Sequence, residues 1–140
     1  MIQRLQTLWL LVASALAFTT LKVPFFSGNI MVENLNQFQR FTAMGNIFLM
    51  ILTVAVGIAA LITIFLYNDR KLQLKISILI LTISLLNLFL FYLETKKFIP
   101  TDWSFNLTAA AAIAIPVFLM MAIRGIYKDE KLIKSVDRLR

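Results

Sequence analysis

The chain contains no cysteine and no histidine among its 140 residues. Disulfide bonds, thiolate chemistry and the commonest protein ligands of zinc and haem are therefore excluded. Charge is also sparse, because only 15% of the residues are charged and the seven acidic ones all lie outside the centres of the long apolar runs. A pump or proton relay normally places ionisable groups near the middle of the membrane. We therefore expect no cofactor, no metal site and no coupled ion transport by this chain alone.

Apolar sequence fills most of the chain. Hydrophobic residues make up 60% of it, and the mean hydropathy is +0.83. Four runs carry no charged residue and are each long enough to cross a hydrocarbon core of about 30 Å as a helix: 5–21, 41–68, 76–93 and 103–123. None of them alternates as a barrel strand would. The sequence predicts one all-α membrane domain over 1–140, a four-transmembrane-helix bundle.

Flanking residues set the expected boundaries. We predict spans at 5–26, 42–67, 74–94 and 105–125, outer loops at 27–41 and 95–104, a cytoplasmic turn at 68–73 and a cytoplasmic tail at 126–140. Small residues at Ala13-Ser14-Ala15 also fit a signal-peptide cleavage site, but the apolar run continues to Leu21, which favours an uncleaved first span. The first outer loop is compatible with a short strand at 30–32 or with an interfacial helix.

Lysine and arginine residues predict the orientation of the bundle. With the N-terminus inside, ten basic residues lie on the inner side and four on the outer side, namely Lys22, Arg40, Lys96 and Lys97. Because cytoplasmic segments carry the excess of basic residues, both termini are expected in the cytoplasm. We expect a multi-pass protein of a bacterial inner membrane. The net charge of +7 is then assigned to the membrane surface, and no nucleic acid is expected.

Few polar residues interrupt the spans. Asn87 is the one amide well inside a span, and we predict an interhelical hydrogen bond for it. Pro116 lies inside the fourth span, where the missing N–H favours a helix kink. The third span has no alanine or glycine, whereas the fourth is rich in alanine. The third span is therefore predicted to be the most lipid-exposed and the fourth the most closely packed.

The C-terminal tail has amphipathic spacing. Leu132, Ile133, Val136 and Leu139 fall within one sector of a helical wheel, opposite a face that holds Glu130, Lys131, Lys134 and Arg138. We predict a short amphipathic cytoplasmic C-terminal helix. A helix this short needs a surface to order it. Anionic headgroups and the cytoplasmic face of a partner protein both satisfy that need.

Three segments carry a resemblance to a known family. The opening MIQRLQTLWLL (1–11), the turn NDRKLQ (68–73) and the end KDEKLIKSVDRLR (128–140) resemble an uncharacterised family of small Bacteroidetes integral membrane proteins, domain of unknown function 4293. The resemblance covers the whole chain and implies four spans in an inner membrane. It implies no activity, cofactor or catalytic residue. Its signature residues all map to the predicted cytoplasmic face, which suggests a contact surface there.

These observations lead to three functional hypotheses. The first is a non-enzymatic accessory or scaffold subunit of an inner-membrane complex, with a membrane protein partner or a second copy of itself. Its candidate cytoplasmic docking residues are Arg4, Arg70, Lys71, Asp129, Glu130, Lys131, Arg138 and Arg140. The alternative is a small-molecule or lipid-handling protein, such as a transporter subunit, with a cavity near Ser84, Asn87 and Pro116. A membrane enzyme using Glu94 and Asp102 is the weakest hypothesis, because no nucleophile and base are paired.

Overall fold

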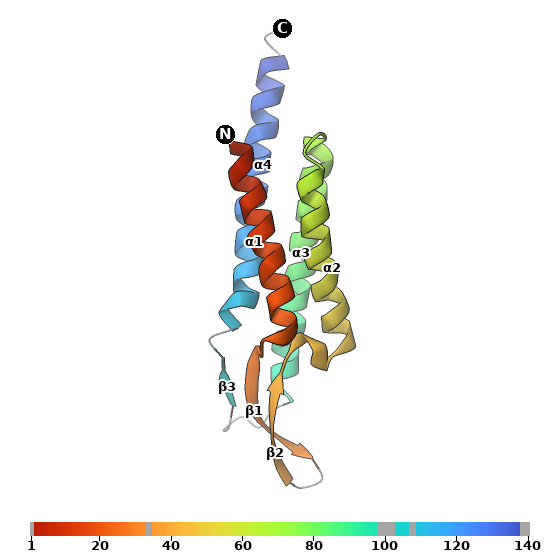
Figure 1. The fold of residues 1–140 in the computed structure, drawn as a ribbon, viewed down its shortest axis with the longest axis vertical. Helices are drawn as coiled ribbons and strands as arrows, with labels where there is room; N and C mark the ends of the chain where they lie inside the picture. The colour runs from red at the N-terminus through yellow and green to blue at the C-terminus, as the bar shows by residue number, and fades with distance from the viewer. Residues whose placement is uncertain (1, 33–34, 98–102, 107–108, 138–140) are drawn as a thin grey trace.

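The computed structural model describes residues 2–32, 35–97, 103–106 and 109–137. Four long helices form a bundle, and a small sheet covers one end of it (Figure 1). The helices are α1 (Ile2–Lys22), α2 (Ile47–Phe65), α3 (Arg70–Thr95) and α4 (Ala109–Asp137). All four are long and apolar enough to cross a membrane. The predicted bundle is therefore confirmed as a multi-pass membrane fold, and both termini lie at the end opposite the sheet.

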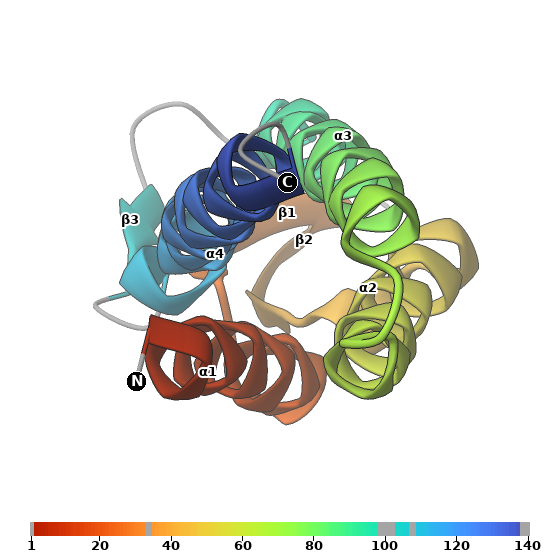
Figure 2. The same cartoon turned by 90° about the horizontal axis from the view of Figure 1, so that it is seen from above.

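The helices are arranged in a ring when the bundle is viewed along its axis (Figure 2). Helix α1 packs most extensively against α4, and also against α2, while α3 packs against α2 and α4. The central core holds fully buried Leu10, Ala13 and Ala17 of α1 together with Leu119 and Ala122 of α4. The alanines among them let the helix backbones approach closely. The share of buried residues is lowest in α3, at 28%, and highest in α4, at 39%, as the sequence predicted.

The first outer loop is a β-hairpin. Strands β1 (Phe26–Val32) and β2 (Leu35–Phe41) pair antiparallel, with Phe26 opposite Phe41. Strand β3 (Trp103–Phe105) pairs with the other edge of β1, so the sheet order is β2-β1-β3. Of the two structures left open for this loop, the strand is the one found, and it is longer than 30–32. An interfacial helix is not present among the described residues.

Aromatic packing joins the sheet to the bundle. Phe25, next to β1, stacks on Phe91 of α3 with ring centroids 4.7 Å apart, and Phe41 meets the same ring edge-on at 6.1 Å. The first helix ends earlier than the predicted span, at Lys22, because Pro24 cannot donate a helical hydrogen bond. The N–H of Phe25 instead donates to the carbonyl oxygen of Phe41 at 2.9 Å.

The turn between α2 and α3 is shorter than predicted. We expected a turn over 68–73, but α3 begins at Arg70. Asp69 caps the helix, since its side chain accepts a hydrogen bond from the backbone N–H of Leu72 at 3.1 Å. Arg70 and Gln73 thereby become helical residues with fixed directions, and both turn into the bundle.

The predicted C-terminal helix is not a separate element. Helix α4 runs without interruption from Ala109 through Pro116 to Asp137. No break occurs at 126, because Ile126 is fully buried and packs in the bundle. The part of the tail that the structure describes therefore continues along the axis of α4 and projects beyond the other helices (Figure 1). The kink expected at Pro116 stays a prediction.

Candidate functional site

Four polar side chains meet inside the bundle at the end that carries the termini. They are Gln6 of α1, Arg70 and Gln73 of α3, and Asp129 of α4, with 2%, 9%, 3% and 9% of their surfaces exposed. Three different helices therefore contribute to one cluster, which we call the polar cluster. Charged groups at such depth are costly unless they are hydrogen-bonded, so these contacts hold α1, α3 and α4 in register.

Gln6 is the centre of the polar cluster. Its Nε2 donates to Oδ2 of Asp129 at 2.8 Å, and its Oε1 accepts a long hydrogen bond of 3.5 Å from Nη1 of Arg70. Among the described residues, Arg70 and Asp129 form no direct ion pair; the amide of Gln6 lies between them. The two charges thus compensate each other through a neutral side chain, which is weaker than a bidentate contact.

The hydrogen bonds of Arg70 use only one of its three nitrogen atoms. Besides the contact with Gln6, its Nη1 donates to Oε1 of Gln73 at 2.9 Å. Nε2 of Gln73 then donates to the carbonyl oxygen of Thr63 at 3.1 Å, which ties α3 to α2. A guanidinium has five N–H donors. The three on Nε and Nη2 have no acceptor among the residues that the structure describes.

Two crevices flank the polar cluster, and Gln6 lines both. The larger has a volume of about 490 Å³ and lies between α1 and the α2–α3 turn, lined by Gln6, Thr7, Ile64, Phe65, Tyr67, Arg70 and Gln73. We call it the Arg70 crevice. The second, of about 280 Å³, lies between α1 and α4 and includes Trp9, Arg124 and Lys128. Both combine an apolar wall with cationic side chains.

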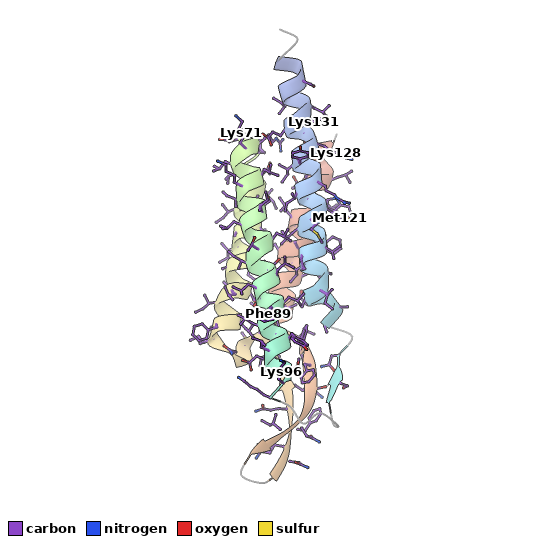
Figure 3. All side chains as sticks on the ribbon, turned by 180° about the vertical axis from the view of Figure 1, so that it is seen from behind. Lys71, Phe89, Lys96, Met121, Lys128 and Lys131 are labelled. Atoms are coloured by element: carbon purple, nitrogen blue, oxygen red, sulfur yellow. The ribbon has the colours of Figure 1, made fainter. Side chains whose placement is uncertain are left out.

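The predicted docking residues fall into three groups. Lys71 and Lys131 are exposed, and Figure 3 shows Lys71, Lys128 and Lys131 at the terminal end while Lys96 lies near the sheet. Glu130 is half-buried. Arg70 and Asp129 are buried in the polar cluster, each with 9% of its surface exposed, so neither presents its charge on the outer surface of the bundle.

The side chains of the remaining docking candidates are not described by the structure. Arg138 and Arg140 lie outside the described residues, and the side chain of Lys134, on the predicted polar face of the tail, is not described either. Arg4 lies on α1, but its side chain is not among those described. Lys71, Glu130 and Lys131 are consequently the docking candidates that the structure describes outside the polar cluster.

Asn87 lies in the middle of the bundle. Its Nδ2 donates to Oγ1 of Thr53 at 2.9 Å, which links α3 to α2, while its Oδ1 is buried and has no partner among the described residues. The adjoining cavity, also lined by Thr20 and Ser84, measures only about 10 Å³. That volume is close to the space one water molecule needs. The interior at this point is too small for a solute.

A second polar contact lies at the sheet end. Nδ2 of Asn46 donates to Oε1 of Glu94 at 2.7 Å, and Lys97 forms an ion pair with the same carboxylate at 2.7 Å. Glu94 therefore holds the start of α2 against the end of α3. Asp102, its partner in the enzyme hypothesis, lies outside the described residues.

Sequence reasoning overlooked the two glutamines as site residues, although a signal for Gln73 is present. The buried residues of α3 are Arg70, Gln73, Ser77, Ile80, Ser84, Asn87, Phe91 and Thr95. Their separation of three or four residues traces one face of a helix. Most of the polar residues of the third span fall on that face, which identifies its interior side. No comparable pattern singles out Gln6, whose role depends on the approach of α4.

Comparison with known proteins completes the description. No match was found among curated proteins or among solved structures. A family model described as a domain of unknown function, DUF4293, matches residues 2–139. This match covers nearly the whole chain, including the polar cluster and the projecting end of α4. The chain belongs to the DUF4293 family of proteins.

Proposed function

We propose that the chain is a non-enzymatic accessory or scaffold subunit of an inner-membrane complex, and that it docks through its cytoplasmic face. The observation that carries the proposal is the projecting end of α4. Asp129 is the last residue of α4 with a contact to α1 in the polar cluster, and the helix continues to Asp137. Eight further residues extend a helix by about 12 Å.

The projecting end exposes apolar side chains. Leu132 and Ile133 are 55% and 50% exposed, and Lys131 beside them is exposed as well. Neighbouring aliphatic side chains on a segment that projects past the other helices favour burial against another surface. A partner with an apolar patch and acidic side chains complements them.

The direction of α4 favours a protein over the membrane surface as that partner. An amphipathic helix that binds headgroups lies in the plane of the membrane. Here the segment continues the axis of a transmembrane helix and leads away from the bundle (Figure 1). Leu132 and Ile133 lie on this projecting segment, past the ends of the other helices, where a protein surface can reach them.

Solute transport receives less support. It requires a path or cavity through the bundle, and the cavity at Asn87 has a volume of about 10 Å³. Most hydroxyl groups around it already bond to backbone carbonyls, as Thr53 does to Leu49 at 2.7 Å. The larger crevices open at the rim of the bundle and do not cross it.

The proposal is tested by gentle extraction from native membranes with a tag on the N-terminus. We expect a partner in stoichiometric amount. The double substitution Leu132→Asp and Ile133→Asp should reduce its recovery at least tenfold, because losing two aliphatic contacts costs about 2 kcal/mol or more. Ser135→Asp is the control for charge, because it introduces one aspartate on an exposed neighbouring position without removing an aliphatic side chain. Two differently tagged copies distinguish a second copy of this chain from another protein. Unchanged recovery of the partner with the double variant would disprove docking through α4.

A further inference from the structure

We propose that the Arg70 crevice binds the phosphate group of an anionic phospholipid. This inference is independent of docking through α4, because it concerns another surface and another class of ligand. It starts from the unused donors of Arg70. The side chain is nine-tenths buried, its Nη1 donates to two glutamine oxygens, and its other three N–H groups have no acceptor among the described residues.

The crevice beside Arg70 has the size and the chemistry for an anion. Its volume of about 490 Å³ accommodates a phosphate with part of its glycerol backbone. Asp129 bonds to Gln6, on the opposite side of the amide from Arg70, and is not among the residues that line this crevice. Planar guanidinium groups bind phosphate oxygens through two parallel hydrogen bonds. Arg70 is therefore positioned as the anion-binding group of the crevice.

The walls of the crevice indicate a lipid rather than a free anion. Ile64 and Phe65 are the last two residues of the membrane-spanning helix α2, and the side chain of Phe65 is 75% exposed. Tyr67, at the mouth, is 59% exposed and has the amphipathic character typical of the headgroup level. An acyl chain can follow the apolar wall toward the bilayer while the phosphate remains at Arg70. A soluble phosphate would leave that apolar wall uncovered.

Charge around the crevice favours an anionic headgroup over a zwitterionic one. Lys71 and Lys75 are exposed on the first two turns of α3, one and five residues after Arg70. Basic pockets at the headgroup level of transmembrane helices attract anionic lipids for this reason. Of the two flanking crevices, this one alone has its cation buried and held in place by hydrogen bonds, since Arg124 and Lys128 of the other are exposed.

The test uses the full chain reconstituted in an equimolar mixture of dioleoyl-phosphatidylglycerol and dioleoyl-phosphatidylcholine. The lipids retained after extraction are counted by native mass spectrometry. We expect phosphatidylglycerol to be retained about tenfold over phosphatidylcholine, because both lipids offer a phosphate to Arg70 but the positive choline of phosphatidylcholine is repelled by the cations at the crevice. Arg70→Gln should abolish this preference. Arg70→Lys should retain part of it, because the charge stays and the planar fork is lost. Lys71→Gln removes an exposed cation that does not line the crevice, and should lower the preference less than Arg70→Gln does, because Arg70 and Lys75 remain.

A second pair of variants leaves the polar cluster intact, in case Arg70→Gln fails to fold. Thr7→Phe adds a ring at an exposed position that lines the crevice, and should abolish the preference. Leu8→Phe, at the next exposed position outside the lining, should not. Equal retention of both lipids by the wild type, or equal losses in Thr7→Phe and Leu8→Phe, would overturn the proposal. Thermal stabilisation by inorganic phosphate without any lipid preference would assign the site to a soluble anion instead.

Discussion

Gly125 determines how closely α1 approaches α4 at the polar cluster. A Cβ atom at this position would lie 2.6 Å from Cγ of Gln6 and 3.2 Å from its Nε2. Alanine would therefore displace Gln6 and separate it from Asp129. Alanine gains about 1 kcal/mol of helix propensity, whereas a buried polar group left without its partner costs about 1–3 kcal/mol. We expect Gly125→Ala to lower the free energy of unfolding in detergent by about 1 kcal/mol.

A double-mutant cycle assigns this loss to the contact with Gln6. In a Gln6→Ala background the obstructing side chain is absent, so Gly125→Ala should become neutral or stabilising. Gly45→Ala is the control, because the nearest side-chain atom to its Cβ would be an ordinary 3.4 Å away. An equal cost of Gly125→Ala in both backgrounds would show that the loss has another origin.

Helix α3 distributes its polar and apolar residues in the opposite way to a helix in water. Its buried face carries Gln73, Ser77, Ser84 and Asn87, while large aliphatic and aromatic side chains such as Phe89 lie outside. Figure 3 shows Phe89 on the outer surface of the bundle. Lipid solvates leucine as well as a protein interior does, so small polar residues gather where helices meet. Hydropathy alone consequently does not rank positions by burial in this helix.

Two hydroxyl residues of α3 test this difference between the faces. Ser77 is fully buried and Thr82 is exposed, and each donates to a carbonyl oxygen four residues earlier in the same helix. Ser77→Leu should destabilise the bundle by about 1–3 kcal/mol, because the added atoms do not fit between packed helices. Thr82→Leu should be neutral or stabilising. Both substitutions replace a hydroxyl side chain by leucine and so make the helix more hydrophobic. Comparing the thermal unfolding of the two variants therefore separates the effect of packing between helices from the effect of transfer into lipid. Equal shifts of the two melting temperatures would contradict the assigned faces.

Sequence predicted the helices well and the sheet poorly. Long apolar runs leave a helix as the main way to satisfy the backbone in lipid, which is why all four elements were found. Outside the membrane that constraint ends, and the pairing of β1 with β3 depends on residues about 75 positions apart, which local patterns do not reveal. The distribution of lysine and arginine along the sequence indicated the end of the bundle that holds the polar cluster. It could not indicate that Arg70 and Asp129 turn inward, because that depends on Gln6 of another helix.

At the scale of the whole molecule, the two ends of the bundle differ in structure and charge. The sheet covers one end, where the described basic residues are Lys22, Arg40, Lys96 and Lys97. Six more lie on α3 and α4 toward the other end, namely Arg70, Lys71, Lys75, Arg124, Lys128 and Lys131. The termini, Lys71, Lys128 and Lys131 gather at the other end (Figure 3). Basic residues resist translocation across the inner membrane. The end with the termini is therefore expected to face the cytoplasm, as docking through α4 requires.

The absence of cysteine makes this orientation directly testable, because any thiol introduced into the chain is the only one present. Gln39→Cys places a thiol on exposed β2, and Ser135→Cys places one on the exposed end of α4. In spheroplasts, a membrane-impermeant maleimide should label Gln39→Cys at once and Ser135→Cys only after the membrane is opened. Ser77→Cys, buried in the bundle, should stay unlabelled in both conditions and reports that the protein is folded. The reverse pattern would place the projecting end of α4 outside the cell and remove the basis for a cytoplasmic partner. It would leave the lipid crevice intact, since the crevice would then face the outer leaflet and an anionic phospholipid of that leaflet could reach Arg70.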